Sequence, residues 1–312
     1  MKIRPSSEDA LWMGAGALIL ALVLLLVWHF RREENPAQQL AFKATRVDLV
    51  GRMGLALARA SEAEKSAVLA ITDQESQTFA DQARAATAEV DQERQELGKL
   101  LEKGGTAREK ELLTQFSQVF GDLQHIDDDV LSLAVKNTNL KAYALAFGPA
   151  AETLAEMDAA LSRVAAKTAD SPDARQIMPL AFGARIAVLR IQSLLAPHIA
   201  EESDAKMDQL EASMREDERE AREDLGALAA LPRLARDADL ATAASRFARY
   251  GELETRILAL SRENTNVRSL ALSLNQKRKA MTVCLESLDA LKQTLLEEPI
   301  AGVNYGRPQL PR

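Results

Sequence analysis

Two pairs of polar residues interrupt stripes of apolar residues, and they are the residues of this sequence best suited to bind something. Asp127 and Asn137 lie in one stripe, and Glu254 and Asn264 lie in a second. A buried polar group without a partner costs about 1–3 kcal/mol, so polar groups kept in both stripes indicate a use. We therefore predict a ligand-binding layer between helices, flanked by Asn139 and Asn266 and formed by Asp127, Asn137, Thr138, Glu254, Asn264 and Thr265.

The same residues have two further interpretations that need no ligand. A single buried asparagine fixes the register of a coiled coil, and a polar layer repeated in both stripes can do the same. If the helices are rotated, the polar residues instead face solvent. The sequence leaves all three interpretations open.

Other chemistry is poorly represented in the chain. The three histidines (His29, His125 and His198) and the single cysteine, Cys284, form no cluster of the kind that zinc sites use. Consecutive carboxylates at 127–129 point in different directions on a helix, and no oxygen-rich calcium loop follows them. Phosphate-binding, dinucleotide-binding and serine-hydrolase motifs are missing. The sequence predicts no enzyme, no metal site and no cofactor.

The residues that must position these side chains are helix formers. The chain of 312 residues is rich in Ala, Leu, Glu, Arg, Gln and Lys, while aromatic residues make up only 4%. Strand-rich domains draw on β-branched and aromatic residues instead. No proline stands between Pro36 and Pro149, which permits long helices. We predict an all-α protein, and its net charge of −7 argues against nucleic acid as a partner.

A single membrane span is predicted at residues 10–30, after a short N-terminal tail at 1–9. The segment carries no formal charge, and at ~1.5 Å per residue it covers ~31 Å, the thickness of a bilayer core. Trp12 and Trp28 stand near its two ends, where interfacial aromatic residues prefer to lie. A cleaved signal peptide has a shorter apolar region followed by a small-x-small site. We therefore expect an uncleaved, single-pass anchor and a juxtamembrane linker at 31–43.

The remainder of the chain repeats itself. The sequence Asn-Thr-Asn-Leu at 137–140 recurs as Asn-Thr-Asn-Val at 264–267, an offset of 127 residues. The same offset pairs apolar residues without a gap over roughly ninety positions, among them Phe120 with Phe247. These residues recur at steps of three and four, which is typical of packed helices in bundles and coiled coils. We predict a first helical hairpin at 44–168 and a duplicate at 173–297.

Helix-breaking residues divide the hairpins. Gly104 and Gly105 end one helix, and Thr106 with Glu109 has the spacing of a capping box. A break at 169–172 separates the hairpins, and Leu231-Pro232 followed by Asp237 divides the second. We expect four long helices packed as one elongated antiparallel four-helix bundle, with a disordered tail at 298–312; the helices are 44–103, 107–168, 173–230 and 237–297.

The segments at 61–66 and 131–142, after an N-terminal membrane helix, resemble the four-helix-bundle sensory module of bacterial methyl-accepting chemotaxis receptors. The resemblance covers about residues 10–165 and reaches the rest of the chain through the repeat. It implies a domain outside the inner membrane that senses a small ligand or a partner protein. Those receptors also have a second span, a linker module and a cytoplasmic signalling hairpin. The sequence has none of these, so we expect it to act through another chain.

The membrane orientation follows from two opposed arguments. Lys2 and Arg4 precede the span while Arg31 and Arg32 follow it, and the positive-inside rule alone puts the large domain in the cytoplasm. Large domains translocate largely regardless of their charge, and the resemblance favours the periplasm. We predict a sensor-like inner-membrane protein with a periplasmic bundle that binds a small molecule or a partner protein, or forms a homo-oligomer. The alternative is a structural helical scaffold or spacer of the cell envelope without a ligand.

Overall fold

The computed structural model describes residues 21–22 and 36–299, and these residues contain helices and no strand. The all-helical prediction is therefore confirmed for this part of the chain. Apart from the helical residues Ala21 and Leu22, the predicted span at 10–30 lies outside the described residues, as does the tail beyond residue 299.

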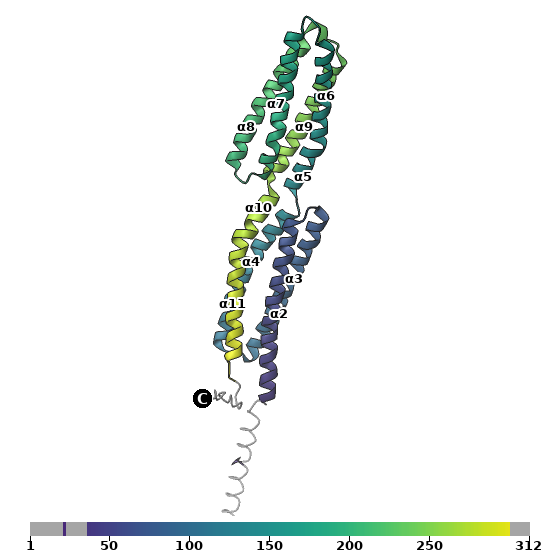
Figure 1. Ribbon diagram of the computed structural model, residues 1–312. Coiled ribbons are helices and arrows are strands. Elements are labelled where there is room, and N and C mark those ends of the chain that lie inside the picture. Colours follow the sequence, from purple (N-terminus) through teal and green to yellow (C-terminus); the bar gives the residue numbers. More distant parts are fainter. Residues whose placement is uncertain (1–20, 23–35, 300–312) are drawn as a thin grey trace, which may run out of the picture. The chain divides into compact units, whose positions relative to one another are not determined.

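The helices follow one another with short connections (Figure 1). The α-helices are α2 (Pro36–Leu69), α3 (Asp73–Gly104), α4 (Ala107–Ala134), α5 (Thr138–Leu145), α6 (Ala151–Thr168), α7 (Ala174–Ala200), α8 (Asp204–Ala230), α9 (Ala238–Glu263), α10 (Thr265–Leu272) and α11 (Arg278–Glu297). Two π-helical segments, η1 (Ala146–Ala150) and η3 (Ser273–Lys277), and one 3-10 turn, η2 (Pro232–Leu234), complete the order.

The chain divides into two compact units. Among the described residues, the first contains 36–54, 91–116 and 286–299, and the second contains 55–90 and 117–285. In the first unit the buried guanidinium of Arg46 lies 3.0 Å from a carboxylate oxygen of Glu109 and 2.8 Å from one of Glu298. Three segments that are distant in the sequence thus share one ion-paired group.

The turns that the sequence predicted are confirmed. The backbone N–H of Thr106 donates to Glu109 Oε2 at 2.8 Å, and the N–H of Glu109 donates to Thr106 Oγ1 at 3.2 Å, which is the predicted capping box. Helix α6 ends and α7 begins on either side of 169–172. Asp237 caps α9 by accepting hydrogen bonds from two backbone N–H groups of its first turn.

The expectation of four uninterrupted long helices is wrong. The predicted helix at 44–103 is broken at 70–72, and the one at 173–230 is broken at 201–203. At the first break the N–H of Glu75 donates to Thr72 Oγ1 and the Thr72 hydroxyl donates to the Glu75 carboxylate, so a new helix is capped there. This Thr-x-x-Glu pattern is visible in the sequence and marks a helix start that the apolar stripe obscures.

Both broken helices fold back on themselves within the second unit. Arg59 of α2 pairs with Glu89 of α3, and Ala67 packs against Ala80 and other residues of α3 and α4. Arg190 of α7 likewise pairs with an acidic residue of α8, Asp217, at 2.7 Å. The predicted first and third helices are therefore antiparallel pairs, because a residue late in one helix meets a residue early in the next.

Helices α6, α7, α8 and α9 pack together in the second unit around a shared apolar core (Figure 1). Helices α6 and α9 run antiparallel: Arg163 of α6 bonds to Asp239 at the start of α9 at 2.7 Å, while Arg246, later in α9, pairs with Glu156, earlier in α6. Alanine supplies a third of the core residues and allows close helix approach; these alanines include Ala160, Ala181, Ala184, Ala187, Ala221 and Ala243. We call these four helices the α6–α9 cluster.

Of the helices in the described ranges, α7 alone is long and apolar enough to cross a membrane, with a mean hydropathy of 1.3 over its best window. Length and composition are weak grounds for a span, because the core helix of a water-soluble domain has the same character. Arg185 of α7 bonds to Asp158 of α6 at 2.5 Å, and Arg190 pairs with α8. One face of α7 packs against α6, α8 and α9, whereas Phe182, Ile186 and Leu189 on this helix are exposed.

Candidate functional site

Two asparagines mark the place where both halves of the repeat depart from regular helix. Asn137 and Asn264 are the described non-glycine residues with positive φ, at 51° and 53°. Each precedes a short helix, α5 or α10. Asparagine tolerates this left-handed conformation better than most residues. These two asparagines of the apolar stripes therefore stand at helix breaks rather than inside continuous helices.

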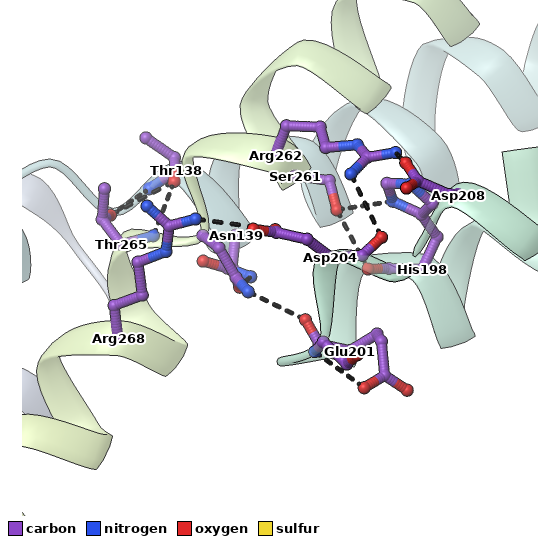
Figure 2. Close-up of polar contacts among 12 residues, drawn as sticks. Thr138, Asn139, His198, Glu201, Asp204, Asp208, Ser261, Arg262, Thr265 and Arg268 are labelled. Atoms are coloured by element: carbon purple, nitrogen blue, oxygen red, sulfur yellow. Dashed lines mark hydrogen bonds and ion pairs between the residues drawn. The ribbon is translucent and has the colours of Figure 1, made fainter. Parts of the chain in front are cut away.

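The residues after these asparagines bond to one another in matched pairs (Figure 2). The N–H of Thr138 donates to Thr265 Oγ1 at 3.2 Å, and the N–H of Thr265 donates to Thr138 Oγ1 at 3.1 Å. The N–H of Asn139 donates to Asn266 Oδ1 at 3.2 Å, and the reciprocal bond is 3.1 Å long. In each pair of bonds, a residue and its repeat equivalent 127 positions later exchange the roles of donor and acceptor. The contact therefore has local two-fold symmetry.

The side-chain amides extend the same pattern. Asn139 Nδ2 donates to Asn264 Oδ1 at 2.8 Å, and Asn266 Nδ2 donates to Asn137 Oδ1 at 2.9 Å. The amide of Asn264 also donates to the carbonyl of Glu201 at 2.8 Å. We call the six residues that make these paired bonds the Asn–Thr joint; they are Asn137, Thr138, Asn139, Asn264, Thr265 and Asn266.

The joint brings together four of the six residues predicted to bind a ligand. Asn137, Thr138, Asn264 and Thr265 are buried, and protein groups occupy their hydrogen-bonding atoms. Asn137 Nδ2, for example, donates to Ser76 Oγ at 3.0 Å. This arrangement has the form of the polar layer that fixes helix register.

The segments beyond the joint keep the repeat in register. Helices α5 and α10 have equal lengths, and the π-helical segments η1 and η3 begin 127 residues apart, as do α5 and α10. Pro149 in η1 has no N–H to donate, which disrupts regular α-helical bonding there. Segment η3 has no proline; it carries Lys277 into the interior.

Asp127 lies outside the joint, in a buried ion cluster. Lys277 Nζ is 2.7 Å from Asp127 Oδ1 and 2.6 Å from Glu64 Oε2, and all three side chains are buried. Burial raises the pKa of Asp127, and the Lys277 ammonium opposes that rise. Sequence reasoning missed Lys277 and Glu64. Lys277 lies three residues after Leu274 and four before Met281, and this stripe spacing was the available signal.

Glu254 occupies the position equivalent to Asp127 but has different surroundings. The residue equivalent to Lys277 is Ala150, 127 positions earlier, and the residue equivalent to Glu64 is Ile191, 127 positions later. Glu254 is 8% exposed and forms no hydrogen bond or ion pair with any residue that the structure describes. Burial raises the pKa of Glu254 to about 7, and the nearby carboxylate of Glu218 adds to the rise.

The Glu254 side chain lines a groove between α8 and α9 with a volume of about 440 Å³. Apolar walls come from Met214 and Leu258, and Gly251 leaves the surface open one turn before Glu254. A buried carboxylate at an accessible groove can take up a proton or a cation. Glu254 is thus a predicted site residue that lines an open groove.

A second polar cluster joins α8 to α9 (Figure 2). Arg262 bonds to Asp208 and Glu211 at 2.5 and 2.6 Å, and the ring of His198 lies 2.8 Å from Ser261 Oγ and 3.0 Å from Glu211. Arg262 lowers the pKa of the Glu211 carboxyl by hydrogen bonding to it. The sequence suggested no role for this cluster, whose members come from three helices.

Neither the cysteine nor the acidic and histidine side chains form a further reactive or metal-binding site in the described residues. Cys284 is a buried free thiol, and burial raises its pKa to about 12, which keeps it protonated and unreactive. Within residues 36–299 no group of three or more His, Cys, Asp or Glu side chains is arranged to hold a metal ion.

Comparison with known proteins adds no identification. No protein-family model matches the sequence, and no curated protein matches it.

Proposed function

We propose that this protein is a membrane-anchored, sensor-like helical protein that binds a small ligand or a partner protein and acts through another chain. The observation that carries the proposal is the Asn–Thr joint. It links two long helical paths, α4–α5–α6 and α9–α10–α11, at repeat-equivalent residues through reciprocal hydrogen bonds.

The joint lies where both paths exchange packing partners in the second unit. Leu131 and Val130 near the end of α4 pack against α2 and α3, whereas α6, on the same path, packs against α7 and α9. On the other path α9 packs in the α6–α9 cluster, while Lys277 of η3 bonds to Glu64 of α2. A small shift of either path therefore changes contacts on both sides of the joint, which is how packed helices pass a conformational change.

The architecture that we propose has two duplicated helical hairpins packed as one antiparallel four-helix bundle, behind a membrane anchor at 10–30. Its support is the exact repeat of α5 and η1 in α10 and η3. The resemblance to the sensory module of methyl-accepting chemotaxis receptors favours a periplasmic location. We propose that location for residues 36–299.

A helical scaffold without a ligand is the second candidate. The observation that favours it is that the side-chain amides of the joint already bond to protein groups. Asn139, for example, donates to Asn264 Oδ1, and Asn264 donates to the carbonyl of Glu201. A joint of this kind also suits a rigid spacer.

A thermal-unfolding screen of the full chain in detergent separates the two functions. We expect a compound from a set of amino acids, organic acids, amines and metal salts to raise the unfolding temperature specifically. At a concentration of 100 Kd, ligand binding adds about 2.7 kcal/mol, which corresponds to roughly 5 °C for a domain of this size. A screen in which no compound changes the unfolding temperature contradicts the sensor function and supports the scaffold.

A further inference from the structure

We infer that Glu254 binds the ammonium group of an organic amine that enters the groove between α8 and α9. The inference rests on the proposed sensor function and names the ligand class and the residue that recognises it. No residue of the Asn–Thr joint lines this groove.

At the equivalent carboxylate of the repeat, the same interaction forms within the chain. There Asp127, the equivalent of Glu254, contacts the Lys277 ammonium at 2.7 Å. Around Glu254 the carboxylate is kept, but the residue equivalent to Lys277 is Ala150 of the first half. A buried carboxylate without a counter-charge is costly, and an ammonium group from outside the chain removes that cost.

The groove has room for such a ligand, and Glu254 meets the requirement for a recognition residue. Its side chain is more than nine-tenths buried, lines the groove and has no partner among the described residues. The volume of about 440 Å³ lies in the range of small-molecule pockets. Met214 and Leu258 supply apolar walls for the carbon chain of an alkylamine.

The charges around the groove favour a cation. Four carboxylates line it, those of Glu211, Glu218, Glu252 and Glu254, against two guanidinium groups. Both guanidinium groups are engaged with carboxylates of their own helix: that of Arg215 lies 3.6 Å from Glu211, and that of Arg222 lies 2.5 Å from Glu218. Three of the lining carboxylates are paired as well, Glu211 with Arg262, Glu218 with Arg222 and Glu252 with Arg249. Glu254 is therefore the lining carboxylate whose charge no described arginine balances, and it is the group that attracts a positive ligand.

An ammonium group fits this site better than a divalent metal ion. Calcium takes six to eight oxygen ligands and magnesium takes six, whereas Glu254 offers one buried carboxylate between apolar walls. The described residues hold no cluster of three or more metal-ligating side chains. An ammonium group needs one charged acceptor, and the attached carbon chain gains from the apolar surface.

Calorimetric titration of the full chain in detergent at pH 8 tests the inference, with n-butylammonium chloride as the probe and 1-butanol as its uncharged analogue. We expect n-butylammonium to bind and 1-butanol to bind at least tenfold more weakly. Glu254→Gln should weaken n-butylammonium binding at least tenfold. Glu252→Gln should change it less than twofold, because Glu252 lines the same groove but is exposed and pairs with Arg249.

The outcomes distinguish this site from the proposed function. Equal binding of n-butylammonium by the wild type and the Glu254→Gln variant, with both fully helical by circular dichroism, overturns the assignment of Glu254. Absence of n-butylammonium binding, together with stabilisation by another compound of the screen, overturns the amine class and leaves the sensor function standing. Absence of any ligand in the titration and in the screen overturns both.

Discussion

At the scale of single residues, the equivalent carboxylates Asp127 and Glu254 have different electrostatic surroundings. Asp127 is buried with Lys277, whose ammonium also bonds to Glu64. Glu254 is buried without a cation, and its pKa is about 7. The pKa of both carboxyls is raised by burial, but only in the first case does a built-in positive charge counteract the rise.

The pKa of Glu254 predicts a specific pH dependence of stability. Its pKa in the folded chain is about 7, against 4.5 for an unperturbed glutamate, so between these values the folded state binds more protons than the unfolded state. The free energy of unfolding therefore falls as the pH rises from about 4.5 through 7. The full difference corresponds to about 3 kcal/mol.

We expect the Glu254→Gln variant to lack this contribution and to be about 3 kcal/mol more stable than the wild type at pH 8. Urea unfolding followed by circular dichroism at pH 5 and pH 8 measures the difference. The Glu252→Gln variant serves as the control and should keep the wild-type slope. A Glu254→Gln variant with that same slope contradicts the raised pKa.

At the scale of elements, helix breaks decide which residues become neighbours. The break at Thr72 turns one predicted helix into the antiparallel pair α2 and α3, and the break at 201–203 does the same for α7 and α8. The breaks at Asn137 and Asn264 have another effect, since the chain continues onward and changes its packing partners there.

The left-handed backbone at Asn264 makes a prediction that depends on conformation. Glycine adopts positive φ freely, whereas alanine pays about 1–2 kcal/mol there. We expect Asn264→Ala to be less stable than Asn264→Gly by about 1 kcal/mol in urea unfolding. Asn266 provides the matched control because it lies inside helix α10, where alanine should be the more stable of the two replacements by about 1 kcal/mol. The same order at both positions is incompatible with this backbone assignment.

At the scale of the whole molecule, the repeat places a buried carboxylate at equivalent positions of its two halves, Asp127 and Glu254, and the two differ in whether the chain supplies a cation beside them. Asp127 binds the ammonium of Lys277 from the same chain, and we propose that the equivalent carboxylate, Glu254, binds the ammonium of a ligand. The large number of exposed ion pairs on α8, such as Arg219 with Glu216 and Glu223, covers a solvated face.

The proposed membrane orientation makes a prediction for the whole chain. An alkaline phosphatase fused after Arg312 is active only outside the cytoplasm, so a periplasmic domain should give an active fusion in intact cells. A β-galactosidase fusion at the same residue is the opposite control and should be inactive. A full-length, well-expressed phosphatase fusion without activity contradicts the periplasmic location.

The sequence by itself determined what short-range chemistry controls. The capping box of Thr106 and Glu109 and the cap at Asp237 involve residues within three positions of each other, so their pattern predicts their geometry. The helical class likewise follows from residues that favour helix wherever they stand. The repeat was also readable, because its two copies share residues at a fixed offset.

Only the tertiary structure decided which side chain faces which across the chain. Asp127 and Glu254 have the same place in the stripe, yet one meets Lys277, 150 residues later in the sequence, and the other lies beside an open groove. The Asn–Thr joint likewise forms between residues 127 positions apart. Such contacts depend on how helices fold back and exchange partners, and apolar spacing constrains the face of a helix without naming the helix that packs against it.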